Sequence, residues 1–332
     1  MAEAPTGPEL GTYERIIVAF SGGKDSLACL LHLLDAGVDP RRVELWHHDI
    51  DGREGSDLMD WPVTRAYCQR VAEAFGLPLY FSWLEGGFER EMLRDNTPKA
   101  RTFWQEPGGT IGSSGGNGKG GKRLRFPQVS ADLSVRWCSA YLKIDVCAAA
   151  VRGQERLVGR RVLIVTGERG EESSARARYA TFEPDRSDNR DGRPGARRYV
   201  DHWRPIHKWT EAQVWEAIAR HRILPHPCYR LGWGRASCQF CIFGSKDQWA
   251  SARAVDPVRF AKIAAYEERF GSTIQRRLSV VELADAGTPY PATADAALVA
   301  LALGHEHPPV RLAEGETWTT PPGAFGESCG PT

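Results

Sequence analysis

The sequence lacks any apolar stretch long enough to cross a membrane, and no secretory apolar segment opens it. It also lacks a large net charge, because 43 Lys and Arg against 42 Asp and Glu leave only +1 at pH 7. No internal repeat is visible in its 332 residues. These absences predict a cytoplasmic globular chain of one large or two small domains without membrane contact. A nucleic-acid partner would have to bind a local basic face.

The polar loop that follows the first predicted strand has neither of two common nucleotide-binding spacings, that of the Walker A loop and that of the Rossmann glycine pattern. The apolar run 16–20 leads through this short loop into the helical pattern 27–34. The loop is Ser21, Gly22, Gly23, Lys24, Asp25 and Ser26. A strand, a tight turn and a helix N-terminus in this order form an anion site, because backbone N–H groups converge there and the glycines leave room for phosphate oxygens. The structural alternative is a glycine turn capped by Asp25 or Ser26.

The loop S-G-G-K-D-S resembles the PP-loop of ATP pyrophosphatases and adenine-nucleotide α-hydrolases, which cleave ATP between the α and β phosphates. This resemblance implies that the whole hexapeptide binds ATP together with Mg²⁺. It also implies a catalytic role for Lys24, Asp25 and Ser26. Lys24 would add a positive charge to the phosphate site.

The order of the predicted elements indicates an α/β fold built on a doubly wound, mainly parallel sheet. Strands are predicted at 43–47, 79–83 and 161–166, and an amphipathic helix at 61–75. Ligands of such sheets lie beyond the carboxyl ends of the strands. The side chains that follow these ends and are expected near the nucleotide or its Mg²⁺ are Asp49, Asp51, Gly167, Arg169 and Arg176. For either aspartate the alternative is a polar turn.

Four regions are expected along the chain: a loose start at 1–12, the nucleotide-binding domain at 13–250, a helical region at 251–304 and a loose tail at 305–332. The stretch 107–122 is too rich in glycine to predict packing. Its basic residues suit a lid over an anionic substrate, and a solvated insert is equally compatible.

Eight cysteines in a cytoplasmic chain favour metal binding or catalysis over disulfides. The candidate ligands are Cys138, Cys228, Cys238 and Cys241. Their spacing is compatible with a structural Zn²⁺ or an iron–sulfur cluster and does not choose between them. Buried free thiols are the structural alternative. Cys29, Cys68 and Cys147 lie on apolar helical patterns and are expected in the core.

Four further segments make the resemblance specific: 136–143, 167–176, 205–215 and 227–241. They are similar to the phosphoadenosine phosphosulfate (PAPS) reductase family, and most similar to its ATP pyrophosphatase branch in DNA phosphorothioation, the DndC-like and SspD-like proteins. The similarity spans roughly residues 13–250. It implies an adenine-nucleotide α-hydrolase-like fold and a [4Fe-4S] cluster carried by the four candidate cysteines.

Two departures separate this chain from the assimilatory reductases, which have a degenerate PP-loop and, in their cluster-bearing forms, an adjacent Cys-Cys pair where this chain has Cys138-Ser139. Both favour an enzyme that adenylates an acceptor for iron–sulfur-dependent sulfur transfer. The resemblance implies DNA as the acceptor, with a tRNA base or a small metabolite as alternatives. A cysteine desulfurase is an expected type of sulfur donor.

Two rival functions stay open from the sequence. One is a PAPS reductase, which needs no ATP and would use Cys329 near the C-terminus. The other is a non-catalytic nucleotide-sensing subunit whose cysteines hold structural zinc.

Overall fold

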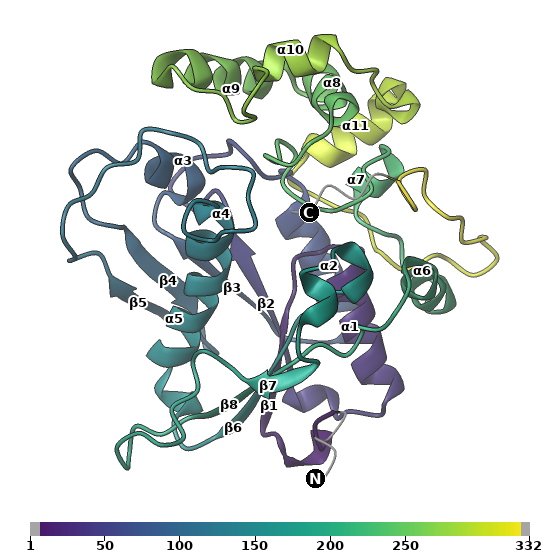
Figure 1. Cartoon of the computed structure of the whole chain (residues 1–332). Helices are drawn as coiled ribbons and strands as arrows, with labels where there is room; N and C mark the ends of the chain where they lie inside the picture. The colour runs from purple at the N-terminus through teal and green to yellow at the C-terminus, as the bar shows by residue number, and fades with distance from the viewer. Residues whose placement is uncertain (1–6, 327–332) are drawn as a thin grey trace.

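The centre of the molecule is one eight-stranded sheet with the strand order β5-β4-β3-β2-β1-β6-β8-β7 (Figure 1). The computed structural model describes residues 7–326. The strands are β1 (Arg15–Ala19), β2 (Val43–Asp49), β3 (Leu79–Leu84), β4 (Arg101–Gln105), β5 (Ile111–Gly115), β6 (Arg161–Val165), β7 (Phe182–Pro184) and β8 (Tyr199–Trp203). The five neighbouring strands β3, β2, β1, β6 and β8 are parallel. At one edge β4 pairs antiparallel with β3 and β5 pairs antiparallel with β4, and at the other edge β7 pairs antiparallel with β8. The predicted mainly parallel α/β sheet is confirmed.

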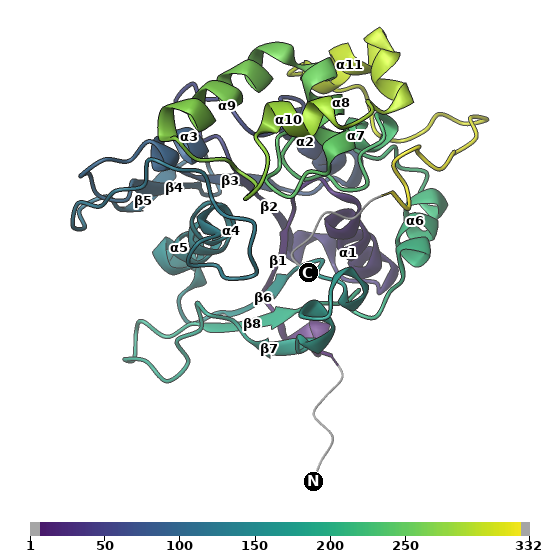
Figure 2. The same ribbon diagram turned by 45° about the horizontal axis from the view of Figure 1, so that its top comes forward.

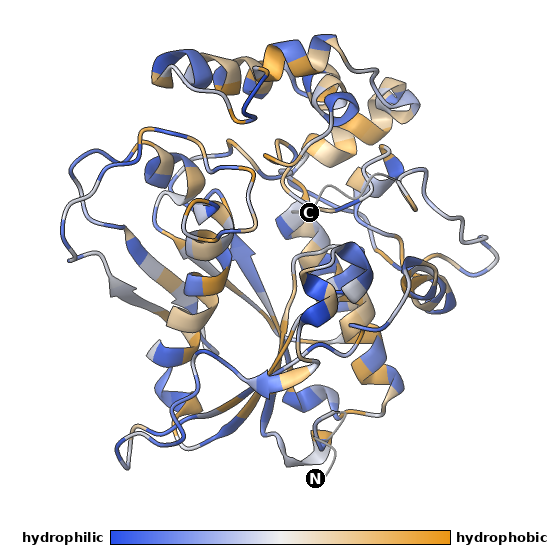
Figure 3. Ribbon diagram, in the orientation of Figure 1, coloured by the Kyte–Doolittle hydropathy of each residue, from blue (hydrophilic) through white to orange (hydrophobic). Residues whose placement is uncertain are grey.

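Helices cover both faces of the sheet. They are α1 (Lys24–Asp35), α2 (Thr64–Phe75), α3 (Gly87–Met92), α4 (Trp137–Ser139), α5 (Asp145–Gly153), α6 (Glu211–Arg220), α7 (Pro227–Arg230), α8 (Lys246–Val255), α9 (Pro257–Phe270), α10 (Val280–Asp285) and α11 (Ala296–Leu303). Because side chains alternate along a strand, Ile16 and Val18 of β1 pack into the core with α1 and α2, while Ile17 packs toward α5. Figure 3 shows the hydrophobic residues along the central strands and on α1.

The prediction that the glycine-rich stretch 107–122 does not pack is wrong in part, because β5 lies within it. Ile111–Gly115 pairs with Arg101–Gln105 as an edge hairpin. Glycine makes this pairing possible at one position, since a Cβ on Gly112 would lie 2.3 Å from the indole nitrogen of Trp104. The absence of a side chain therefore lets a tryptophan cover the strand.

The helices α8 to α11 lie together above the carboxyl ends of the central strands (Figures 1 and 2). They cover most of the region 251–304 that was predicted to be helical. Arg259 of α9 joins them to the segment after β2, because its Nη1 lies 2.7 Å from the carbonyl oxygens of both Asp57 and Asp60. No helix within residues 7–326 has the length and apolarity that a membrane span requires.

Replacing Arg259 tests whether this helical layer is part of the folding unit. Arg259→Met should lower the free energy of unfolding by about 2–4 kcal/mol, because two carbonyl oxygens lose a charged donor. Chemical denaturation measures the change. Arg253→Met is the control, since its ion pair with Asp285 is exposed and should contribute less than about 1 kcal/mol. Equal stability of the two variants would contradict the joining role of Arg259.

Candidate functional site

The loop between β1 and α1 is a tight turn that leads directly into the N-terminus of α1. Gly22 has a φ of 79°, a left-handed conformation that favours glycine. Gly23 is the N-cap of α1 and makes no side-chain capping bond. The hydroxyl of Ser26 donates to the carbonyl of Gly23 at 2.9 Å and lies 3.3 Å from the hydroxyl of Ser21. Neither Asp25 nor Ser26 acts as an N-cap, and the backbone N–H groups of Gly23 and Lys24 donate to the hydroxyls of Ser21 and Tyr229.

Lys24 is only 2% exposed. Its ammonium lies 3.0 Å from Asp25 Oδ2 and 3.8 Å from Glu211 Oε1, at the start of α6. In this structure two carboxylates therefore balance the positive charge of Lys24, which the sequence analysis expects to bind phosphate. A bound phosphate would have to compete with them for the ammonium.

Asp25 ties the loop to the end of β6. Its Oδ1 accepts from Arg169 Nε at 2.7 Å, and Arg169 is 3% exposed. Burial alone would raise the pKa of the Asp25 carboxyl, but the charges of Lys24 and Arg169 lower it below its usual value. Between the two partners, Gly167 lies so close that a Cβ there would be 2.8 Å from the carbonyl carbon of Asp25. The predicted meeting of these two strand ends is thus present in the fold.

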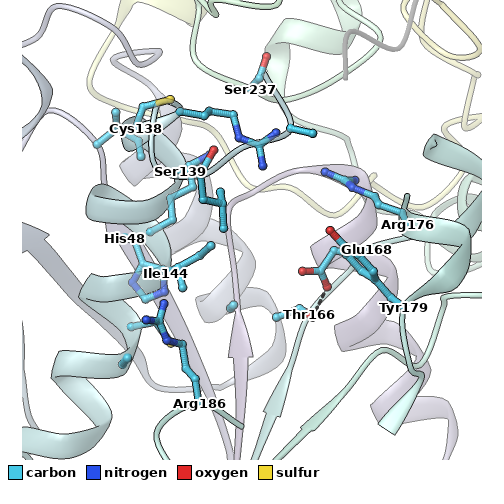
Figure 4. A pocket seen from close by; sticks show the side chains of 18 of the residues that line it. His48, Cys138, Ser139, Ile144, Thr166, Glu168, Arg176, Tyr179, Arg186 and Ser237 are labelled. Atoms are coloured by element: carbon cyan, nitrogen blue, oxygen red, sulfur yellow. Dashed lines mark hydrogen bonds between the residues drawn. The ribbon is translucent and has the colours of Figure 1, made fainter. Parts of the chain in front are cut away.

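A cavity of about 740 Å³ opens beside this contact, within the usual range of ligand pockets (Figure 4). Its floor includes Ala19 of β1 and Thr166 and Glu168, which flank Gly167. Its basic lining residues are Arg136, Lys143, Arg176, Arg186, Arg204 and Arg235. Residues 21–26 do not line the cavity themselves. The loop lies next to it, because Ala19 precedes the loop and Gly167, between two lining residues, contacts Asp25. No residue of the glycine-rich stretch 107–122 lines it either.

Three arginines gather at one side of the cavity. The charges of Arg176 and Arg235 add to burial in lowering the pKa of Arg136 below its usual value. Glu172 accepts a hydrogen bond from Arg176 and lies 3.6 Å from Arg235 Nη2. This cluster suits an oxyanion. Arg136 and Arg235 were missed in the sequence, although each lies within three residues of a candidate cysteine.

The two aspartates after β2 are engaged elsewhere. Asp49 is buried and pairs with Arg53 at 2.9 Å and Arg65 at 2.8 Å. Asp51 accepts from the backbone N–H groups of residues 59 and 60, and burial raises its pKa to about 6. Neither lines the cavity. Their predicted role toward the nucleotide or Mg²⁺ stays a prediction.

Three of the four candidate cysteines reach the cavity. Cys138, Cys238 and Cys241 line it, and burial followed by the neighbouring Cys241 raises the pKa of Cys138 to about 11. Cys228 is fully buried, with its Sγ 4.0 Å from the carbonyl of Arg235, and does not line the cavity. The expected core positions of Cys29 and Cys68 are confirmed, whereas Cys147 is half-buried and also lines the cavity. Cys329 lies outside the described residues.

The donor chemistry of the three thiols fits a cluster or a zinc ion, since soft thiolates suit both. Their arrangement fits less closely. Within residues 7–326, no three His, Cys, Asp or Glu side chains are close enough together to hold a metal ion. Cys138, Cys238 and Cys241 therefore share a cavity lining without forming a metal site in this structure, and Cys228 is not part of that lining.

Two further residues support the loop and were not singled out in the sequence. The hydroxyl of Tyr229 accepts from the backbone N–H of Lys24 at 2.9 Å. Glu211 accepts from Trp215 Nε1 at 3.1 Å, in addition to its contact with Lys24. Tyr229 follows the candidate ligand Cys228 and Glu211 lies in the segment 205–215, so only the fold could show that both face the loop.

Comparison with known proteins finds a family match to part of the chain. Residues 120–243 match the family described as the phosphoadenosine phosphosulfate reductase domain. The match contains the four candidate cysteines and the segment 167–176, and it begins after the loop 21–26. An uncharacterized 37.8 kDa protein from the gpa 5′ region of Escherichia phage 186 is 29% identical over 278 residues, which cover 78% of this chain and 76% of that protein.

Tyr229→Phe tests the support of the loop. It should lower the free energy of unfolding by about 1–3 kcal/mol, because the buried N–H of Lys24 loses its acceptor. Thermal and chemical unfolding measure the change. Tyr199→Phe on β8 is the control and should stay within about 0.5 kcal/mol of the wild type. A Tyr229→Phe protein as stable as this control would contradict the role of the hydroxyl.

Proposed function

We propose that the protein is a PP-loop ATP pyrophosphatase that adenylates an acceptor for sulfur transfer. The observation that carries the proposal is the position of the loop 21–26, which borders the same cavity that three thiols and a cluster of arginines line. A phosphate site, an oxyanion site and a sulfur site are thereby adjacent. The match to the reductase domain supports an ATP-dependent activity of the PP-loop type.

In this proposal the first turn of α1 and the glycines of the loop bind the β and γ phosphates of ATP with Mg²⁺. An oxygen of the acceptor attacks the α phosphorus, and the bond to the bridging oxygen breaks, so that pyrophosphate leaves with the electron pair. Lys24 exchanges its two carboxylate partners for the phosphates and stabilises the leaving charge. AMP on the acceptor is then a good leaving group, which a sulfide can displace.

Cys138, Cys238 and Cys241 are the residues that would hold a [4Fe-4S] cluster, with zinc as the alternative ion. A cluster bound by three thiolates would supply an iron site open to sulfur. The protein's own contribution is to hold the three thiols beside the arginine cluster.

The proposed acceptor is a DNA backbone phosphate, as in DNA phosphorothioation. The arginines 136, 176 and 235 support an anionic acceptor, because they form a local basic site in a chain whose net charge is only +1. A cysteine desulfurase is the proposed type of sulfur donor.

The family that matches residues 120–243 favours one rival, a PAPS reductase. That enzyme would release sulfite from PAPS with a thiol reductant and would leave ATP intact. Incubation with each nucleotide, followed by chromatography of the products, separates the two. A nucleotide-sensing zinc subunit would bind ATP and convert neither substrate.

Lys24→Ala tests the proposed catalytic loop. It should slow pyrophosphate release from ATP about 10²–10³-fold, because a charge that stabilises the leaving group is lost. Lys99→Ala is the matched control, since Lys99 forms a comparable 2.9 Å ion pair with Asp145 away from the loop. Circular dichroism checks that both variants fold. Wild-type release by a folded Lys24→Ala protein would contradict the assignment.

Cysteine substitutions test the sulfur site after anaerobic purification. Iron and acid-labile sulfide should be lost in Cys138→Ser, Cys238→Ser and Cys241→Ser, because each would remove one of three ligands. They should be retained in Cys228→Ser and in the control Cys147→Ser, which changes a thiol that lines the cavity from α5. Full iron content in Cys138→Ser would contradict the proposal that the three thiols share one site. A colourless wild-type protein that contains zinc would show that the site holds zinc instead of a cluster.

A further inference from the structure

A chain of polar side chains at the cavity floor ends on the carboxylate of Glu168 (Figure 4). Thr166 and Glu168 follow β6, while His202 and Arg204 come from the neighbouring strand β8 and its end. Arg204 Nη2 lies 3.3 Å from His202 Nδ1, and His202 Nε2 lies 2.6 Å from the hydroxyl of Thr166. That hydroxyl donates to Glu168 Oε2. Four side chains are thus joined in one row.

Arg204 determines the direction of these hydrogen bonds. A guanidinium only donates, so His202 Nδ1 accepts and the neutral ring carries its proton on Nε2. Burial, followed by the charge of Arg204, lowers the pKa of His202, which keeps the ring neutral. Nε2 then donates to Thr166, whose own proton is directed to Glu168. The chain therefore orients the carboxylate of Glu168 and occupies one of its oxygens.

The other oxygen of Glu168 is available to a ligand. The side chain is 30% exposed, and the bond from Thr166 and the approach of Arg204 Nε, at 3.4 Å, both involve Oε2 rather than Oε1. Burial alone would raise the pKa of Glu168, but His202, Arg204 and the bond from Thr166 lower it below its usual value. The cavity therefore contains an oriented and ionised hydrogen-bond acceptor.

Glu168 follows Gly167, the residue that lies against the loop 21–26. Its neighbour Gly167 lies against the backbone of Asp25, so that a Cβ there would be 2.8 Å from the carbonyl carbon. Consecutive residues of an extended chain are about 3–4 Å apart. In a nucleotide whose phosphates lie on the loop, the group at this distance is the ribose.

We propose that Glu168 accepts a hydrogen bond from a ribose hydroxyl of the bound nucleotide and disfavours a nucleotide that carries a phosphate in its place. The inference rests on the proposed nucleotide site. An ionised carboxylate accepts from a hydroxyl and repels a phosphate. Acidic side chains bind ribose hydroxyls in the same way in dinucleotide-binding folds. The cavity should therefore select ATP-like ligands with free hydroxyls over 3′-phosphorylated ones.

Calorimetric titration tests the proposal with ATP, 2′-deoxyATP and 3′-deoxyATP. The wild type should bind ATP about ten-fold more tightly than at least one deoxy analogue, as expected for a hydrogen bond to a charged group. Glu168→Gln should reduce this ratio toward one. It should also bind adenosine 3′,5′-bisphosphate more tightly relative to AMP than the wild type does, because the repelling charge is gone.

Two controls isolate the role of Glu168. Glu183→Gln removes another cavity carboxylate that pairs with Arg204, at 2.7 Å, and should keep the wild-type ratio. Thr166→Val removes the orienting donor and should reduce the ratio, whereas Thr166→Ser, which keeps a hydroxyl, should restore it.

The outcomes separate this inference from the proposed function. If the wild type binds ATP but does not distinguish either deoxy analogue, or if Glu168→Gln keeps the full ratio, the inference is wrong and the nucleotide site stands. If the wild type binds none of the three nucleotides, the proposed nucleotide site is itself wrong.

Discussion

The buried contact between Asp25 and Arg169 is the interaction on which the rest of the site depends. It joins the first turn of α1 to the chain that leaves β6, at 2.7 Å, while Gly167 lets the two backbones touch. Because the chain that leaves β6 passes through this contact, Thr166 and Glu168 are held at the cavity floor and Glu172 is held beside the arginine cluster. A single junction thus positions the loop 21–26, the carboxylate of Glu168 and the arginine cluster relative to one another.

This junction is built from charges that are costly to bury. Lys24 and Arg169 are almost completely covered, and Asp25 lies between them. Buried ion pairs often contribute little net stability, because desolvation offsets their attraction. We therefore interpret this group as a device that orients the loop. Glu211 and Tyr229 extend it toward α6 and α7, so the loop is supported by residues about two hundred positions away in the sequence.

Much of the fold could be predicted because its signals are local. The apolar run 16–20 and the polar loop after it already indicate β1 and the start of α1, and the order of strands and helices indicates a parallel sheet. The prediction was wrong where a long-range contact overrides a local rule: Gly112 belongs to a strand because Trp104 fills the space of its missing side chain. The site divides in the same way. The loop 21–26 and the cysteines have spacings that can be recognised in the sequence. Nothing in the sequence near Tyr229 indicates that its hydroxyl contacts Lys24.

The central claim is that the loop 21–26 and the cavity beside it cleave ATP between the α and β phosphates. The most direct measurement is phosphorus NMR of the products formed from ATP and Mg²⁺ by the anaerobically purified protein, with DNA present as the acceptor. The account predicts pyrophosphate, together with AMP that is free or bound to the acceptor. Release of ADP and inorganic phosphate, or ATP that stays intact while PAPS is reduced, would contradict it.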